Sequence, residues 1–239
     1  MKAFALHKRC FLILMSAFFI ISCSRLPVIK PVDTAMAPDT MRRCHLPFLD
    51  IPYRFIHTIE VALPGGGRTG TVVGVTAFDP VTKTIQSVIM TIEGFVLFDA
   101  SYEKEVRVNR AVPPFNAEHF AGYMMDDVRL IFLTPDGRLS DTGVFEDGST
   151  VCRYYVKQNW VIDVIVHKDN TWEIERYSDS HELLRKVMTF SVRDRIPGMV
   201  ELNAFGFREY TLRLNLINAE PVSPEALRLR PDDAPEDDE

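Results

Sequence analysis

The segment Arg54-Phe-Ile-His-Thr-Ile-Glu-Val-Ala-Leu63 alternates between apolar and mostly polar side chains. The odd positions are largely apolar, namely Phe55, His57, Ile59, Val61 and Leu63. This alternation is typical of a β-strand with one face buried. The segment therefore predicts a strand in a sheet with one apolar face. His57 lies on that face, where a core residue is expected more often than a ligand.

Similar segments lie on both sides of this strand. The glycines at 64–68 and Asp79-Pro80 predict turns. Further strands are expected at 69–78, at 84–98 with a bulge or bend at Gly94, and at 103–112, 151–156, 160–167, 171–177, 185–193 and 207–217. Because brief turns join short strands, the pattern favours an antiparallel meander. We therefore predict a mainly β fold of the α+β class.

One segment, 116–132, has helical periodicity. Its apolar residues recur at a period near 3.6, at Ala117, Phe120, Ala121, Met124, Val128, Ile131 and Phe132. Asn116 suits the N-cap, and Asp127 is expected on the solvated side. The sequence thus predicts one amphipathic helix inserted into the sheet. It either fills the apolar face as ordinary core or forms a lid over a cavity, where Met124 and Met125 would suit varied apolar ligands.

The amino terminus has the layout of a secretory signal. Lys2, Lys8 and Arg9 precede an apolar run at 10–21, which is shorter than the roughly 20 residues that span a bilayer. Ile20-Ile21-Ser22-Cys23 follows and resembles a bacterial lipoprotein signal. That resemblance implies that residues 1–22 are removed and that Cys23 carries acyl chains, which would anchor the protein to a membrane. An ordinary cleaved signal and an uncleaved anchor are the alternatives.

The rest of the chain divides by composition. Residues 23–43 contain three prolines and no periodicity, which predicts a flexible tether, and residues 44–229 form the expected globular domain. The acidic end, 230–239, is expected to be disordered. The formal net charge of −6 provides no basic surface for nucleic acid.

Two cysteines, Cys44 and Cys152, lie within the expected domain. A pair of cysteines in an exported protein suggests a disulfide, although two buried free thiols would show the same pattern.

No pattern of catalytic or metal-binding residues emerges. Gly65-Gly66-Gly67 lacks the Lys-Ser/Thr of a phosphate-binding loop, and the histidines have no zinc-like spacing. Ser178-Asp-Ser-His181 falls in a polar turn with no nucleophile elbow around it. We therefore predict neither an enzyme nor a cofactor or metal site.

Together, the lipoprotein signal, the proline-bearing tether and the β-rich domain with an inserted helix resemble the LolA/LolB-like lipoprotein carriers and receptors. The segments that carry the resemblance are Gly70-Thr-Val-Val-Gly-Val-Thr-Ala-Phe-Asp-Pro80, 88–99 with Gly94-Phe95-Val96-Leu97-Phe98, and 207–217. The resemblance implies a single strongly curved antiparallel sheet, a half-open barrel whose apolar concave face accepts acyl chains. The exposed apolar loop tip of the receptors has no counterpart at 64–67 or 79–81. Ser24 after Cys23 suggests, by analogy, sorting to the outer membrane.

These features predict an outer-membrane lipoprotein that faces the periplasm and binds an acyl chain or a lipoprotein. The expected lining residues are Phe95, Phe98, Phe120, Met124, Trp160 and Leu214. The alternative is a structural or assembly lipoprotein with a filled core that acts through protein–protein contacts, with partners that the sequence does not name. A cavity on the order of several hundred Å³ would favour binding, and a packed sheet with a large exposed apolar patch would favour assembly.

Overall fold

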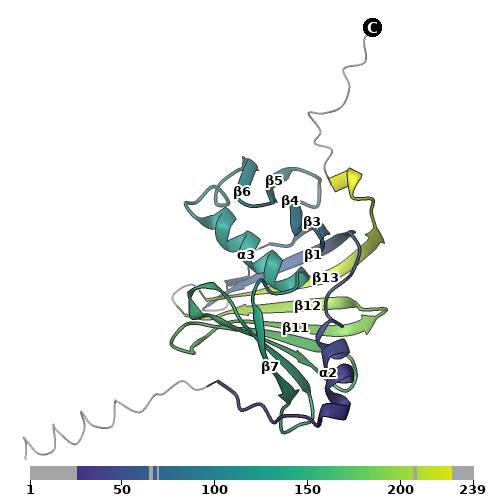
Figure 1. The fold of residues 1–239 in the computed structure, drawn as a ribbon. Helices are drawn as coiled ribbons and strands as arrows, with labels where there is room; N and C mark the ends of the chain where they lie inside the picture. The colour runs from purple at the N-terminus through teal and green to yellow at the C-terminus, as the bar shows by residue number, and fades with distance from the viewer. Residues whose placement is uncertain (1–25, 65–66, 69, 207–208, 228–239) are drawn as a thin grey trace, which may run out of the picture.

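The fold is a single antiparallel sheet that is not closed into a barrel (Figure 1). The computed structural model describes residues 26–64, 67–68, 70–206 and 209–227. Twelve strands pair in the order β6-β5-β4-β3-β1-β13-β12-β11-β10-β9-β8-β7, and the short β2 pairs with the end of β1. The strands are β1 Tyr53–Leu63, β2 Gly67–Arg68, β3 Val72–Asp79, β4 Thr84–Met90, β5 Val96–Tyr102, β6 Val106–Ala111, β7 Arg138–Val144, β8 Thr150–Tyr155, β9 Val161–Val166, β10 Trp172–Tyr177, β11 Leu183–Arg193, β12 Ile196–Ala204 and β13 Tyr210–Pro221. The predicted single antiparallel sheet in a mainly β fold is confirmed.

The first and last strands pair at the middle of the sheet. β1 runs antiparallel to β13, from the pair Tyr53 and Pro221 to the pair Ala62 and Thr211. From β1 the chain meanders outward to the edge strand β6, and the second half of the chain starts at the other edge, β7. Helix α3, Phe120–Phe132, connects these two edges and therefore crosses the inner face of the curved sheet (Figure 1).

The expected long strand at 84–98 is wrong, because it is a hairpin of β4 and β5. The peptide of Thr91 accepts a hydrogen bond from the Gly94 amide at 3.0 Å and donates one to the Phe95 carbonyl at 2.9 Å. Gly94 has φ +89°, a left-handed conformation that glycine adopts without steric cost. The glycine therefore marks a turn and not a bulge. The prediction also missed β7 and β12, and β12 contains Pro197 and Gly198, which weaken a strand pattern.

Helix α3 begins later than predicted. Its first residue is Phe120, and His119 precedes it with φ 64°. Asn116 therefore does not cap the helix.

Part of the expected tether is folded against the domain. Lys30 and Val144 exchange two backbone hydrogen bonds of 2.9 Å each, so the chain pairs with the edge strand β7. The 3-10 turn η2, Thr34–Met36, then leads into helix α2, Ala37–Cys44, which packs on β7, β8 and β9. The expectation of a flexible tether is wrong for this part. The predicted signal, the acylated Cys23 and the acidic end from residue 230 lie outside the described residues.

No helix among the described residues is long and apolar enough to cross a membrane.

Candidate functional site on the inner face of the sheet

Helix α3 fills the inner face of the sheet. Met125, Leu130, Ile131 and Phe132 of the helix are buried. The Phe132 ring lies 5.3 Å from both Phe55 on β1 and Phe78 on β3, and those two rings are 5.8 Å apart. Because these centroid distances are typical of packed aromatic pairs, the helix and the sheet form one continuous core.

His57 belongs to this core. It is 2% exposed, and its ring lies 5.7 Å from Phe55 and 6.2 Å from Phe132. Burial disfavours the charged imidazolium and lowers the pKa of His57 from 6.5 to about 4. His57 is therefore a neutral core residue at neutral pH, as its place on the apolar face of the strand predicts.

Four of the six expected lining residues belong to the packed core. Phe98 is fully buried on β5, and the Phe120 ring meets it edge-on at 5.7 Å. Leu214 on β13 is 7% exposed, and Met124 is half-buried against the same core. These side chains therefore cover the same apolar interior, but they do not surround an open pocket.

The other two lie elsewhere. Phe95 is 54% exposed at the tip of the β4–β5 hairpin, where the guanidinium of Arg110 lies 5.0 Å from its ring. Trp160 stacks on Arg176, with the guanidinium carbon 5.3 Å from its ring, beside a polar cluster that was not predicted.

A cavity of about 20 Å³ remains at one end of the inner face. It lies between the end of α3, the segment at 47–49 and the strands, and is lined by Pro47, Leu49, Phe55, Phe78, Ile131, Phe132, Trp172, Thr189, Arg195, Pro197 and Val200. This space suits about one water molecule, whereas ligand pockets have volumes of roughly 300–1,000 Å³. An acyl chain does not fit in this cavity while α3 is in place. A larger hollow of about 470 Å³ lies elsewhere, lined by mostly polar residues that include Glu60, Glu201 and Arg213.

Asp127 anchors the middle of α3 to the sheet. Its side chain is 5% exposed, and Oδ1 accepts a hydrogen bond of 2.9 Å from Nε of Arg185 on β11. The hydroxyl of Tyr210 on β13 donates to Oδ2. The prediction that Asp127 lies on the solvated side is wrong, because the curved sheet covers more than one face of the helix.

Arg176 on β10 completes this cluster. Its Nη2 lies 4.0 Å from Asp127 Oδ1, and its side chain is 12% exposed. A sequence signal for the cluster existed, because Arg176 follows Trp172 and Ile174 at the inward spacing of β10. The same spacing that indicates buried apolar residues therefore also indicates a buried charge at Arg176.

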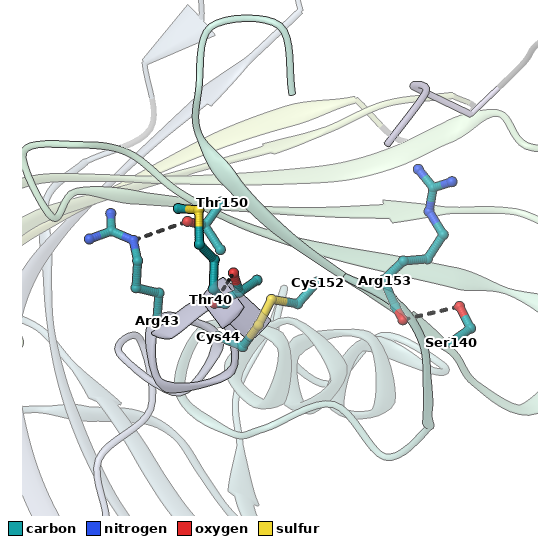
Figure 2. Close-up of a disulfide and its surroundings, with 8 residues drawn as sticks. Thr40, Arg43, Cys44, Ser140, Thr150, Cys152 and Arg153 are labelled. Carbon is teal, nitrogen blue, oxygen red and sulfur yellow. Dashed lines mark hydrogen bonds between the residues drawn. A yellow bond between two sulfur atoms is a disulfide. The ribbon is translucent and has the colours of Figure 1, made fainter. Parts of the chain in front are cut away.

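Helix α2 and the segment at 45–50 together form one wall at the cavity end of the sheet. Cys44 of α2 and Cys152 of β8 form a disulfide with Cα atoms 5.9 Å apart (Figure 2). On the same helix, Arg43 donates to Thr150 Oγ1 at 3.0 Å and to the His167 carbonyl at 2.7 Å.

Arg195, at the β11–β12 turn, holds the chain that follows α2. Its guanidinium pairs with Asp50 at 2.6 Å and donates to the carbonyls of Leu46, at 3.2 Å, and Phe48. This wall is therefore cross-linked to the sheet at both ends.

The β4–β5 hairpin exposes an apolar tip. Ile92 is 70% exposed and Phe95 is 54% exposed, and residues 91–95 form the turn between the strands. The sequence reading missed this tip because it placed these residues inside one continuous strand.

The described residues contain no group of three or more His, Cys, Asp or Glu side chains that could hold a metal ion.

The sheet is similar to solved structures. No family model and no curated protein matches the sequence. A LolA superfamily protein from Nitrosomonas europaea is 11% identical over 81% of this chain and 97% of its own, with a TM-score of 0.55. The domain has the LolA fold.

Two further structures are similar at lower TM-scores. A DUF1329 family protein from Desulfovibrio piger is 13% identical over 82% of this chain and 95% of its own, with a TM-score of 0.48. A proposed outer membrane lipoprotein-sorting domain from Vibrio parahaemolyticus is 12% identical over 83% of this chain and 94% of its own, with a TM-score of 0.43.

Proposed function

We propose that this chain is a non-enzymatic envelope lipoprotein, anchored to the outer membrane through Cys23, whose LolA-like domain binds acyl chains. One observation carries the proposal. The apolar inner face of the sheet is filled by a single helix, α3, which belongs to a connection between two edges and to no strand pair. An apolar chain can therefore take the place of the helix without breaking the sheet.

The exchange is close to balanced in free energy. Removing α3 would expose Met125, Leu130, Ile131 and Phe132, at a cost of about 6–12 kcal/mol at roughly 1.5–3 kcal/mol each. An acyl chain of about sixteen carbons gains up to about 12 kcal/mol at about 0.8 kcal/mol per buried methylene. Chains of about eight carbons, which gain about 6 kcal/mol, already reach the lower end of this cost, and longer chains should bind more tightly.

The apolar tip of the β4–β5 hairpin supports a role at a lipid surface. Ile92 and Phe95 are exposed on a short turn that extends from the sheet. Such side chains gain free energy by entering the boundary between headgroups and acyl chains. The tip would place the domain against the membrane from which the ligand is taken or to which it is delivered.

Native mass spectrometry of the full chain, purified without added lipid, tests the proposal. We expect co-purified lipid or acylated protein that denaturation releases. Met124→Trp enlarges the apolar contact between α3 and the sheet, so it should oppose displacement of the helix and reduce the fraction of protein with bound lipid. The far-ultraviolet circular dichroism spectrum should be unchanged. A chain that carries no lipid and takes up none when it is added would contradict acyl-chain binding.

A second function is favoured by the small cavity. A filled core of this kind suits an assembly lipoprotein that acts through its surface, and β6 is an open edge on which Val108 is 46% exposed. An unpaired edge strand can add a strand from a partner. Cross-linking in the envelope from position 108, together with an absence of bound lipid, would support this function over the first.

A further inference from the structure

Two arginines face each other across neighbouring strands on the inner side of the sheet. Arg176 on β10 is the direct register partner of Arg185 on β11. Each side chain is 12% exposed. Like charges directly opposite each other in a sheet repel, and this repulsion is strongest where water is excluded.

Asp127 is shared between them. Its Oδ1 accepts from Arg185 Nε at 2.9 Å, and its Oδ2 accepts from Tyr210. Two other buried or half-buried arginines have carboxylates of their own. Arg153 binds Asp163 through two hydrogen bonds of 2.7 Å, and Arg129 pairs with Asp136 and Asp126. The pair of arginines beside α3 therefore keeps an excess of one positive charge.

Arg176 has the less complete set of hydrogen bonds of the two guanidinium groups. Its Nε is buried and makes no hydrogen bond to any described residue. Its Nη2 lies 4.0 Å from Asp127 Oδ1, which is beyond hydrogen-bond distance. Burial lowers the pKa of Arg176, but a guanidinium stays protonated in a protein, so the charge remains. A buried donor of this kind is the feature that a bound acceptor would satisfy.

Aromatic rings orient both guanidinium groups. The Arg176 guanidinium carbon lies 5.3 Å from the Trp160 ring, and that of Arg185 lies 5.5 Å from the Tyr210 ring. Stacking leaves the Nε–H edge of Arg176 available, whereas Arg185 already donates from Nε to Asp127 and from Nη1 to the Leu184 carbonyl at 2.8 Å. Phosphates and carboxylates accept such donors in pairs.

We propose that Arg176 and Arg185 bind an anionic group, a phosphate or a carboxylate, at the polar end of the ligand. The inference rests on the proposed function in taking that group to be the head of an amphiphile whose tail lies along the inner face. Asp127 lies in α3 itself. The anion would therefore take over the carboxylate's role as α3 moves, and the ligand class is an anionic lipid.

Tryptophan fluorescence of the full chain can test this site directly. The chain contains two tryptophans, and Trp160 stacks on Arg176. We would titrate the protein with inorganic phosphate, with octyl phosphate and with octyl glucoside, which has the same tail without the charge. Trp160→Phe identifies the part of the signal that arises at the site.

Two variants and one control test the anion site. Arg176→Gln should weaken octyl phosphate binding at least about tenfold and leave octyl glucoside binding unchanged, because a charge-assisted bidentate pair is lost. Asp127→Asn should strengthen phosphate binding, since it removes the carboxylate that competes with phosphate for the two arginines. Arg213→Gln is the matched control, because Arg213 is half-exposed and pairs with Glu201 at 2.7 Å. Near-ultraviolet circular dichroism checks that each variant is folded.

The outcomes separate this inference from the proposed function. If both amphiphiles bind the natural chain and Arg176→Gln equally, acyl-chain binding stands and the anion site is overturned. If inorganic phosphate binds through Arg176 but neither amphiphile binds, the anion site stands and the proposed function fails. Unchanged or weaker phosphate binding by folded Asp127→Asn would overturn the anion site.

Discussion

The carboxylate of Asp127 joins three elements that are far apart in the sequence. It lies in α3 and receives hydrogen bonds from Arg185 of β11 and Tyr210 of β13. A buried carboxylate of this kind positions the helix, because a shift of α3 would break the hydrogen bonds from Arg185 and Tyr210. This one side chain therefore sets the orientation of the helix on the sheet.

Asp127→Ala should lower the free energy of unfolding by about 3–5 kcal/mol, because it leaves Arg185 buried without its carboxylate. Urea unfolding followed by circular dichroism measures the change. The neighbouring Asp126 is half-exposed and pairs with Arg129 at 3.4 Å, so Asp126→Ala is the matched control. We expect that control to cost less than about 1 kcal/mol. Equal losses in the two variants would contradict the anchor.

His57 should make stability depend on pH. Its folded pKa of about 4 lies below the unfolded value of 6.5, so the unfolded chain binds a proton more readily between these values. Stability is therefore complete above the unfolded pKa and decreases as the pH falls toward the folded pKa. Between about pH 7.5 and about pH 5 the loss from this residue is about 2 kcal/mol.

His57→Phe should remove that part of the pH dependence, as measured by urea unfolding at the two pH values. His119 is exposed on the surface, with a 69% exposed side chain, and His119→Asn is the control that should retain the full dependence. A His57→Phe variant with the pH dependence of the natural chain would show that another group is responsible.

Helix α2 shows how a single element can depart from its sequence pattern. The proline-bearing segment before residue 44 carries no periodicity, yet α2 forms there, with Pro38 in its first turn. Contacts with β7, β8 and β9 and the disulfide hold it in place, and these partners come from far along the chain. A short helix of this kind has no stability of its own.

Removing the disulfide should loosen the wall that α2 forms. The two cysteines are separated by 108 residues, and a loop of about 100 residues corresponds to a stabilisation of up to about 4.7 kcal/mol in the chain-entropy model. A Cys44→Ala/Cys152→Ala double variant should unfold at a lower urea concentration, and a reducing agent should affect the natural chain alone. A natural chain that is insensitive to reduction would mean that the bond contributes nothing.

The exposed tip of the β4–β5 hairpin should control contact with membranes. Ile92→Ser together with Phe95→Ser should weaken binding of the domain to lipid vesicles in flotation assays, without lowering the urea midpoint, because both side chains are exposed. Val81, 79% exposed in the β3–β4 turn, provides the control Val81→Ser. Equal loss in both variants would mean that the hairpin has no special role.

The connection between the two edges of the sheet determines what occupies the inner face. Because β6 and β7 lie at opposite edges, the chain must cross the sheet between them, and α3 is the crossing. The strands on either side of it are held by ladders that do not involve the helix. Displacement of α3 would therefore leave these ladders intact.

Ligand binding should therefore change hydrogen exchange in α3 but not at the middle of the sheet. With bound acyl chains, the amides of α3 should lose protection while those of β1 and β13 at the middle of the sheet keep theirs. Mass spectrometry of peptides from both regions, with and without octyl phosphate, measures this difference. Equal protection in α3 with ligand bound would show that the helix stays in place and that the ligand binds elsewhere.

Local patterns in the sequence were enough to predict the class of the fold, most of the strands and the inserted helix. These follow from local periodicity, because alternation in strands and a 3.6-residue repeat in α3 depend on neighbouring residues alone. The same reasoning placed His57, Phe98 and Leu214 in the interior. It also led to the LolA-like fold through the order of these elements.

Which polar groups are buried, and which apolar side chains are exposed, depends on contacts between distant parts of the chain. Asp127, Arg176, Arg185 and Tyr210 meet because a helix and three strands converge. The spacing on β10 indicates that Arg176 points inward, but no local pattern identifies its partners. The same convergence reduced the expected cavity to about 20 Å³ and ordered α2. The curvature of the sheet, a property of all its strands together, covers more of the helix than an amphipathic pattern predicts.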